Sequence, residues 1–275
     1  MSAFRIIQVS DTHLGVAKPW FAPNFAAMAR LAAARRPDLV INTGDISFDG
    51  DDEEGDLAFA RDCHAALEVP WRALPGNHDL GDNPLPGTAP DARTITDPRR
   101  ARYLRYFGDD YWTVDAGDWL LIGLNAQLLG SGLAAEAAQW AFLEAAASRV
   151  DGRPVALFLH KPLFKADPGE TEVHQRYVAP PSRARLLGAL ARVDLRLVAS
   201  GHVHQHRVHT AAGVDHCWCP STAFVLPDRK QPWIGTKHVG YVAYTLHADR
   251  AEVEVVEAPE LVNHDLDVFL PPTAN

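Results

Sequence analysis

The side chains best suited to bind metal ions occur in five short clusters within the first three quarters of the chain. They supply imidazoles, carboxylates and one amide: Asp11, His13, Asp45, Asn77, His78, His160, His202 and His204. Nitrogen and oxygen donors without a thiolate favour zinc, manganese or iron over copper(I) or an iron–sulfur cluster. One histidine after a strand is more often a satisfied polar residue than a ligand, but five clusters together predict a metal site.

Two of these clusters share a two-residue spacing. Asp11 and His13 form a D-x-H pair, and His202 and His204 form an H-x-H pair. On an extended segment, residues i and i+2 project to the same side. We therefore expect the first pair to reach one ion together. The second pair should face the same ion or two neighbouring ions.

The elements that must position these clusters are short buried strands. Continuous apolar runs that predict strands occur at 4–10, 39–42, 71–74, 120–125, 155–159 and 195–200. Stretches with helical spacing lie near 24–36, 53–68, 134–149 and 182–193. This alternation predicts an α/β fold, in which ligands bind at the carboxyl ends of strands. Gly44 and Gly201 precede candidate ligands, where the backbone must turn sharply or approach closely.

The remaining segments complete a single domain over 1–275. Strands with short turns are expected near 206–210, 213–218, 239–246 and 251–257, in a β-rich part (about 205–257) that closes the fold with an antiparallel or mixed sheet. Two long loops, about 80–110 and 161–181, are expected to form the pocket, because loops of this length in a compact domain are usually functional or disordered.

The composition narrows the class of protein. The 275 residues include 47% hydrophobic and 22% charged residues, as in ordinary globular proteins. A formal net charge of −9 gives no general reason to bind a nucleic-acid polymer or an anionic membrane. No signal peptide or membrane span is evident, and three cysteines favour a reducing compartment, so we expect a cytoplasmic protein. Cys217 and Cys219 are expected to share one face of a strand rather than to form a metal or redox pair.

Taken together, the five clusters resemble the signature of the calcineurin-like metallophosphoesterases. The matching blocks are DTH at 11–13, GD at 44–45, GNHD at 76–79, His160 in FLHKP, and GHVH at 201–204. The resemblance implies a four-layer α/β/β/α sandwich of two mixed sheets with a two-metal centre. The most similar branch contains bacterial phosphodiesterases that act on cyclic nucleotides and glycerophosphodiesters.

The resemblance also implies a role for each residue of the blocks. One ion would be held by Asp11, His13, Asp45 and His204. The other would be held by Asp45, Asn77, His160 and His202, so that Asp45 bridges the two. The ions, which would be manganese, iron or zinc, would lower the pKa of a bridging water, and the resulting hydroxide would attack the phosphorus. His78 would bind no metal and would face the substrate phosphate and the leaving group.

Four residues in or beside the clusters have no ligand role in the motif: two histidines, one aspartate and one lysine. His206 continues the two-residue step but has no position in the motif, and His209 lies on the other phase and is expected to be structural. Asp79 would orient a nearby ring or cap a turn or helix. Lys161 stands where relatives that hydrolyse cyclic nucleotides often have a second histidine. It would contact a substrate anion or serve a structural role.

The pocket itself is expected from the two long loops and from GVAKPWFAPNF at 15–25. Trp20 and Phe21 would stack on a substrate base or pack the loop, and packing is the commoner role of aromatic residues. The arginine run from Arg93 to Arg105 would steer an anionic substrate or, as we favour, form a solvated helix face.

The function that follows is a dinuclear metal-dependent phosphodiesterase for a small phosphodiester, such as a cyclic nucleotide or a glycerophosphodiester. One alternative is a phosphomonoesterase or nucleotidase with the same site. Another is a metal-bound scaffold without hydrolytic activity, although a scaffold has no use for His78. The expected partner is a small phosphoester substrate, and the sequence leaves open whether the chain forms a homo-oligomer.

Overall fold

The computed structural model describes residues 3–269 and is built on two mixed β-sheets. The first has the order β12-β11-β1-β2-β3, with β1 (Phe4–Val9), β2 (Leu39–Asn42), β3 (Trp71–Ala73), β11 (Tyr241–Leu246) and β12 (Ala251–Val256). The second has the order β4-β5-β6-β7-β9-β8, with β4 (Trp112–Ala116), β5 (Trp119–Leu124), β6 (Pro154–Leu159), β7 (Asp194–Ser200), β8 (Arg207–Ala211) and β9 (Val214–Trp218). A short parallel pair joins β10 (Phe224–Val225) to β13 (His264–Asp265).

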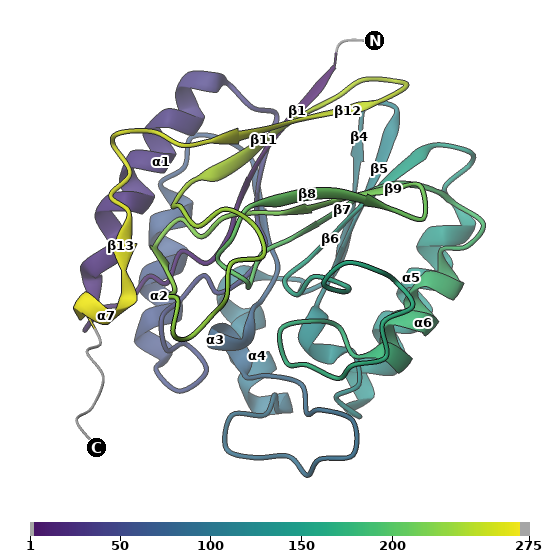
Figure 1. Cartoon of the computed structure of the whole chain (residues 1–275), viewed down its shortest axis with the longest axis horizontal. Coiled ribbons are helices and arrows are strands. Elements are labelled where there is room, and N and C mark those ends of the chain that lie inside the picture. Colours follow the sequence, from purple (N-terminus) through teal and green to yellow (C-terminus); the bar gives the residue numbers. More distant parts are fainter. Residues whose placement is uncertain (1–2, 270–275) are drawn as a thin grey trace.

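Helices lie on both sides of the strands (Figure 1). On one side are α1 (Ala22–Arg35), α2 (Glu54–Ala65), α3 (Asn77–Leu80) and α4 (Asp97–Phe107). On the other side are α5 (Ala134–Ser148) and α6 (Pro180–Ala189). The remaining short helices are η1 (Pro19–Phe21), η2 (Ala126–Leu128) and α7 (Leu266–Phe269).

Three apolar clusters define the layers. Alternate residues of one strand enter different clusters, as Ile6 and Ile7 of β1 show. Ile7 packs with Phe25 and Met28 of α1, whereas Ile6 packs with Phe158 of the second sheet. A third cluster joins the outer face of the second sheet to α5 and α6. The packing order is therefore helix, sheet, sheet, helix, which confirms the predicted four-layer sandwich of two mixed sheets.

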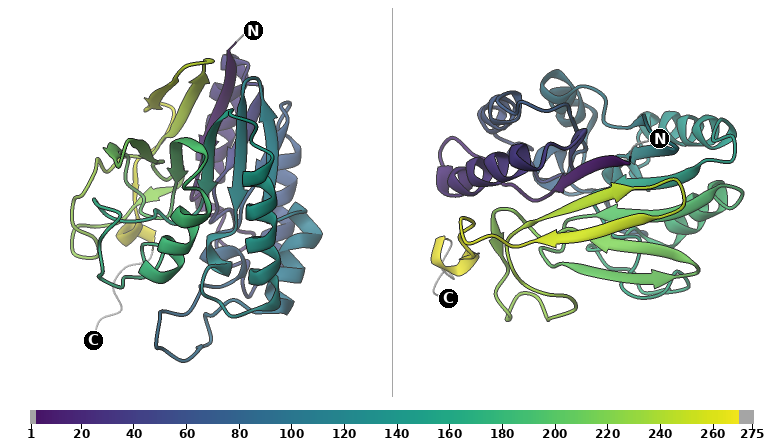
Figure 2. Two further views of the ribbon diagram at one scale, coloured as in Figure 1. Left: turned by 90° about the vertical axis from the view of Figure 1, so that its right-hand side faces the viewer. Right: turned by 90° about the horizontal axis from the view of Figure 1, so that it is seen from above.

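The parallel strands bring the ligand clusters to one end of the molecule. The strands β1, β2 and β3 are parallel to one another, and so are β5, β6 and β7. Their carboxyl ends, and the loops that follow them, gather at the end opposite the N-terminus (Figure 2, left view). Residues that are far apart in the sequence therefore meet at one edge of the sandwich.

The C-terminal third has strands close to the four expected positions, and they lie in mixed sheets as expected. Its strands extend the two existing sheets, because β8 and β9 add to β7 while β11 and β12 add to β1. The stretch 80–110 was expected to be a loop, but its second half forms α4. Residues 161–179 contain no helix or strand, as expected for the second loop.

Two further sequence interpretations can be compared with the structure. Cys217 and Cys219 are both buried in the core between the sheets and both are free thiols, so they share one face as expected. Within residues 3–269, no helix is both long enough and apolar enough to span a bilayer.

Candidate metal centre

The structure brings the predicted ligands together in buried groups. Each group places its potential ligand atoms within 4.8 Å of one another. The groups are Asp11 with His13 and His204, Asp45 with His160 and His202, and His13 with Asp45 and His78. The first two correspond to the two halves of the predicted centre. Because metal ligands must converge in this way, these residues can hold divalent cations.

Asp45 lies between the two halves. Its Oδ2 is 3.9 Å from Nε2 of His13, and its Oδ1 is 3.4 Å from Nε2 of His160. Within the halves, imidazole nitrogens face each other directly. Nε2 of His13 is 3.3 Å from Nε2 of His204, and Nδ1 of His202 is 3.0 Å from Nε2 of His160. Opposed ring nitrogens around a shared carboxylate are the donor arrangement that cations require.

Backbone carbonyls fix which nitrogen of each ring faces the centre. His160 donates from Nδ1 to the carbonyl oxygen of Thr43 at 2.8 Å, so its Nε2 is the nitrogen that faces the centre. His204 donates from Nδ1 to the carbonyl oxygen of Phe224, also at 2.8 Å. Such outer hydrogen bonds set the tautomer and the ring orientation of metal ligands. Sequence reasoning did not find Thr43 or Phe224, because a carbonyl carries no signal in the residue type.

Asn77 provides the clearest sign that the site fits a cation. Its Oδ1 is buried and has no hydrogen-bond partner within residues 3–269. Buried polar atoms are nearly always satisfied, so an orphaned amide oxygen beside imidazoles and carboxylates calls for a partner. A hard or borderline cation supplies one, since amide oxygen is a suitable ligand for such ions.

The local backbone at the ligands is left-handed, which differs from the extended conformation that we expected. Among the described residues, eight non-glycine residues have positive φ, and five are predicted ligands: Asp11, His13, Asp45, His202 and His204. The segments 10–13 and 201–204 are not strands. The two residues of each pair therefore converge through turns, not through the two-residue period of a strand. Such strain is concentrated at functional sites.

Two glycines allow the ligand loops to come close. Gly44 has φ +108°, and a Cβ there would lie 2.6 Å from Nδ1 of His160 and 2.7 Å from the backbone nitrogen of Gly76. A Cβ on Gly201 would lie 1.8 Å from Oγ of Ser10. Both positions were expected to need a close approach, and the structure shows the atoms that approach.

Burial and neighbouring charges set the protonation states in the centre. Burial raises the pKa of Asp11 and Asp45, but adjacent imidazoles outweigh it and hold both pKa values below the ordinary range. Burial also lowers the pKa of His160, yet Asp45 raises it to about 9. For His13 and His202 burial dominates and lowers the pKa well below its usual value. Ionised carboxylates and neutral imidazoles are the forms that bind metal, so a cation would displace the proton that His160 holds at neutral pH.

His78 lies at the edge of the centre. Its ring makes an edge-to-face contact with His13, with ring centroids 4.7 Å apart. Its Nδ1 donates to the carbonyl oxygen of Phe48 at 2.6 Å, and its backbone N–H donates to Oδ1 of Asp45 at 2.9 Å. The ring is half-buried and lines the cleft described below. Its Nε2 is therefore the nitrogen that can take part in proton transfer.

Asp79 is fully buried and acts on backbone rather than on a ring. Its carboxylate accepts hydrogen bonds from the backbone N–H groups of Ile46, Ser47 and Gly76 and from the hydroxyl of Ser47. It thereby caps α3 and fastens the loop of Asp45 to the loop of Asn77. Of the two interpretations left open by the sequence, the capping role is the one that these contacts show.

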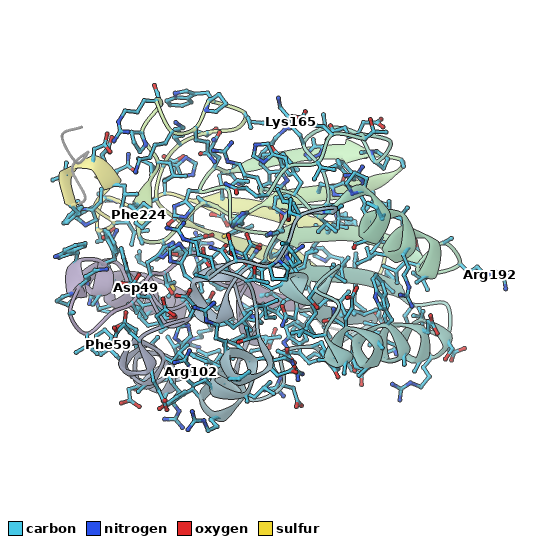
Figure 3. All side chains as sticks on the ribbon, turned by 90° about the horizontal axis from the view of Figure 1, so that it is seen from below. Asp49, Phe59, Arg102, Lys165, Arg192 and Phe224 are labelled. Atoms are coloured by element: carbon cyan, nitrogen blue, oxygen red, sulfur yellow. The ribbon has the colours of Figure 1, made fainter. Side chains whose placement is uncertain are left out.

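A cleft of about 720 Å³ opens above the ligands. Phe48 and Phe224 line it beside the metal centre, and so do residues of the loops at 82–94 and 175–176. Asp49 and Phe224, labelled in Figure 3, mark two parts of this lining. The pocket includes parts of both long loops that were expected to form it.

Other predicted residues lie outside the lining of this cleft. Phe21 is fully buried and packs against Phe48 and Phe224, and Trp20 packs against Phe48. The packing role favoured for both aromatics is the one that these contacts show. Lys161 is buried, and its ammonium contacts protein oxygens.

Two histidines of SGHVHQHRVH lie away from the ligands. His206 bonds from Nδ1 to the carbonyl oxygen of Trp218 at 3.1 Å. His209 stands on β8 opposite His216 of β9, and their rings stack. Neither residue belongs to a ligand group. The run therefore divides into two residues of the centre and two residues of the neighbouring strand segment.

Most of the arginines between 93 and 105 fasten α4 to its surroundings. Arg99 donates to the carbonyl oxygens of Asp51, Ala92 and Thr94. Arg100 forms a bidentate pair with the buried carboxylate of Asp110, with both contacts at 2.7 Å. These contacts differ from the solvated face that we favoured. The exposed Arg93 is the member of the run that lines the cleft.

Comparison with known proteins agrees with this geometry. A protein of Arcobacter nitrofigilis named as a probable glycerophosphodiester phosphodiesterase, GpdQ, is 28% identical over 214 residues, covering 73% of this chain and 71% of that protein. The mouse serine/threonine-protein phosphatase CPPED1 is 26% identical over 239 residues, covering 77% of this chain and 73% of that protein.

A solved structure supports the fold independently of close sequence similarity. A dimetal phosphatase from Danio rerio superposes with a TM-score of 0.65 at 13% identity, covering 93% of this chain and 96% of that chain. The sequence model of the calcineurin-like phosphoesterases matches residues 4–206, which include all five ligand clusters. The chain therefore belongs to the calcineurin-like phosphoesterase family and is a phosphoric ester hydrolase.

Proposed function

We propose that the chain hydrolyses small phosphodiesters at a centre of two metal ions. The observation that carries this proposal is the position of Asp45, whose two oxygens face two separate groups of buried imidazoles. Two cations about 3.5–4 Å apart repel each other, and a shared carboxylate offsets that repulsion. We assign one ion to Asp11, His13, Asp45 and His204, and the other to Asp45, Asn77, His160 and His202. Manganese, iron and zinc all suit this donor set.

The chain's own residues prepare the centre for this chemistry. Two bound ions supply a nucleophile by lowering the pKa of a water molecule and offset the charge on the phosphate oxygens. The carbonyls of Thr43 and Phe224 hold two imidazoles with Nε2 toward the centre before any ion binds. Asp79 holds the two ligand loops against each other. The donors are therefore oriented in advance, so little reorganisation is needed during the reaction.

We assign the proton-transfer role to His78. Its Nδ1 proton is held by the carbonyl oxygen of Phe48, so Nε2 is the atom that gains or loses a proton. Its contact with His13 places it beside the metal ligands and within the lining of the cleft. A protonated Nε2 there can donate to the departing alkoxide or hydrogen-bond an equatorial oxygen of the phosphate.

The lining of the cleft favours a diester over a monoester. Lys18 lines the cleft but pairs with Asp49, and the buried Lys161 beside His160 pairs with Asp82. A phosphomonoester dianion carries a second negative charge, which these paired cations do not offset. Apolar side chains of the lining, among them Phe224, suit the second ester group of a diester. The relative named as a glycerophosphodiester phosphodiesterase supports the same choice.

A phosphomonoesterase is the second candidate, and one observation favours it. Arg93 and Arg176 also line the cleft, and their guanidinium groups could bind the additional charge of a monoester. The similarity to a protein named as a serine/threonine-protein phosphatase is consistent with this alternative.

Protein reconstituted with manganese, iron, cobalt or zinc would distinguish these functions. We expect kcat/KM to be higher for bis(p-nitrophenyl) phosphate than for p-nitrophenyl phosphate, and the reverse order would favour the monoesterase. A panel of cyclic AMP, glycerophosphodiesters, phosphonate monoesters and 5′-nucleotides would then narrow the substrate. Absence of activity with every metal would contradict both candidates and favour a scaffold. Full activity and full metal content in the N77A variant would contradict the assigned ligands.

A further inference from the structure

Lys161 is a buried cation that the proposed chemistry does not use. It directly follows His160, and only 1% of its surface is exposed. Its Nζ lies 2.5 Å from Oδ1 of Asp82 and 2.7 Å from Oδ1 of Asn83. Asn83 is held in turn, because its Nδ2 donates to the carbonyl oxygen of Leu129 at 3.0 Å. A buried ammonium needs such partners, since an unpaired charge in the interior is costly.

The two partners of Lys161 begin the loop that forms one wall of the cleft. The loop is closed at its base, because Asp82 donates its N–H to the carbonyl oxygen of Arg93 and accepts from the N–H of Ile95, both at 2.7 Å. Between these points the chain makes no helix or strand, and the loop extends from the lower end of the molecule in Figure 1. Residues along this loop line the cleft, among them Asp82, Asn83 and Leu85.

We propose that Lys161 is a positioning residue, which fixes the 82–94 wall relative to the metal centre and thereby selects diesters by their second ester group. Lys161 shares the backbone of the ligand His160 and bonds side chains at the start of the wall. It therefore ties the position of the wall to that of the centre. The claim that Lys161 affects diester selectivity rests on the proposed phosphodiesterase function. The claim that Lys161 fixes the 82–94 wall does not.

Two other roles for Lys161 make different predictions. A direct contact with substrate would need an accessible ammonium, but Lys161 is buried and does not line the cleft. The other alternative is purely electrostatic, because Lys161 neutralises Asp82, which lines the cleft and would otherwise repel an anionic substrate. The experiment must therefore separate the position of the wall from its charge.

The test compares two diesters that share a leaving group and a charge. Bis(p-nitrophenyl) phosphate has a large second ester group, and methyl p-nitrophenyl phosphate has a small one. We expect K161M, which keeps most of the side-chain length and removes the charge, to lower kcat/KM for bis(p-nitrophenyl) phosphate relative to that for the methyl ester about tenfold. This is the equivalent of one lost charged hydrogen bond. Metal content should stay at the wild-type level. N83A, made from the wall side, should lower the ratio in the same direction.

A control and a double variant complete the design. R100M removes a cation from another buried ion pair, that of Arg100 and Asp110, neither of which lines the cleft. It should leave the substrate ratio unchanged, which shows that loss of stability alone does not alter selectivity. K161M/D82N removes both charges at the wall but does not restore the hydrogen bonds from residue 161 to the wall. It should therefore keep the altered ratio.

Hydrogen exchange gives a readout that needs no activity. The amides of residues 82–94 should exchange faster in K161M than in the wild type, whereas R100M should affect mainly the region of α4. Equal losses for both diesters, or recovery of the ratio in K161M/D82N, would overturn the proposal. Unchanged exchange in the wall would overturn the anchoring itself. If the wild type hydrolyses neither diester, the proposed function fails, and the exchange experiment still decides whether Lys161 anchors the wall.

Discussion

Gly44 offers the most direct test of how the ligand loops are assembled. An alanine at this position would retain φ +108°, a conformation that L-residues rarely adopt, at a cost of about 1–3 kcal/mol. Its Cβ would also lie 2.7 Å from the backbone nitrogen of Gly76 and 2.6 Å from Nδ1 of His160. Overpacking of this kind costs about 1–3 kcal/mol more, because backbone atoms cannot rotate away. We expect G44A to lower the free energy of unfolding by about 4 kcal/mol.

The same change should weaken metal binding, because both neighbours belong to the centre. Gly76 precedes Asn77, and the Nδ1 of His160 is the atom that holds the ring on the carbonyl of Thr43. Urea unfolding measured at equilibrium would give the stability, and elemental analysis after dialysis would give the metal content. We expect the purified variant to retain less than half of the wild-type metal under the same dialysis.

Gly152 provides the matched control. It has φ +72°, and a Cβ there would meet no atom within 4 Å. G152A should therefore show the cost of positive φ alone, about 1 kcal/mol, with full metal content. If G44A lost no more stability than G152A and kept all its metal, the close approach at Gly44 would not be a constraint on the centre.

Three further predictions follow from the same geometry. H78A should lower kcat about 10²- to 10⁴-fold while metal content stays unchanged, as expected for loss of a general acid, and steady-state kinetics with elemental analysis would check this. H204A should lose metal and activity, whereas H209A should keep both. Equal behaviour of the two variants would contradict the assignment of His204 to the metal centre and of His209 to the neighbouring strand. Burial lowers the pKa of His64 from 6.5 to about 4, so the unfolded chain takes up a proton that the native state rejects as the pH falls between these values. Urea unfolding should show about 2 kcal/mol less stability at pH 5 than at pH 7 from this residue, and H64Q should lose that part of the decrease.

The strands and the candidate ligands could be predicted because both depend on local patterns. The run LVIN at 39–42 is apolar up to its final asparagine, and β2 (Leu39–Asn42) has the same bounds with all four residues buried. A strand buried on both faces has this signature whatever surrounds it. The polar residues that follow such strands must then lie at the carboxyl edge of the sheet. This reasoning reaches Asp45 and His160 without any information about tertiary structure.

The segment of α4 was assigned to a loop, although its arginines suggested a solvated helix face, because its sequence gives conflicting signals. Prolines at 84, 86 and 90 indicated a loop, and the many arginines gave only a weak apolar stripe, of which Tyr103 is the buried member. The start signals were present: the side chain of Thr96 accepts a hydrogen bond from the N–H of Arg99, and Pro98 stands in the first turn. This combination of a capping threonine and an early proline is typical of a helix N-terminus.

Hydrogen-bond partners across the fold were beyond sequence reasoning for a different reason. The ammonium of Lys161 bonds residues that lie 78 and 79 positions earlier in the chain. Likewise, the carbonyl of Phe224 fixes the ring of His204 from 20 residues away. A residue's type shows that it can form such bonds, but only the tertiary arrangement of loops determines with which partner.

The left-handed ligands show why the C-terminal part belongs to the site. Asp11 has φ +52°, which a non-glycine residue adopts only where surrounding contacts hold it, at a cost on the order of 1 kcal/mol. Its N–H donates to the carbonyl of Gly44, and its own carbonyl accepts from the hydroxyl of Ser221 at 2.8 Å. Its Oδ2 accepts from the N–H of His202 at 2.9 Å. Contacts from three distant segments therefore hold one ligand in a strained turn. Residues just beyond the last family motif, which the sequence suggested only close the fold, help to keep the first motif in the conformation that the proposed metal centre needs.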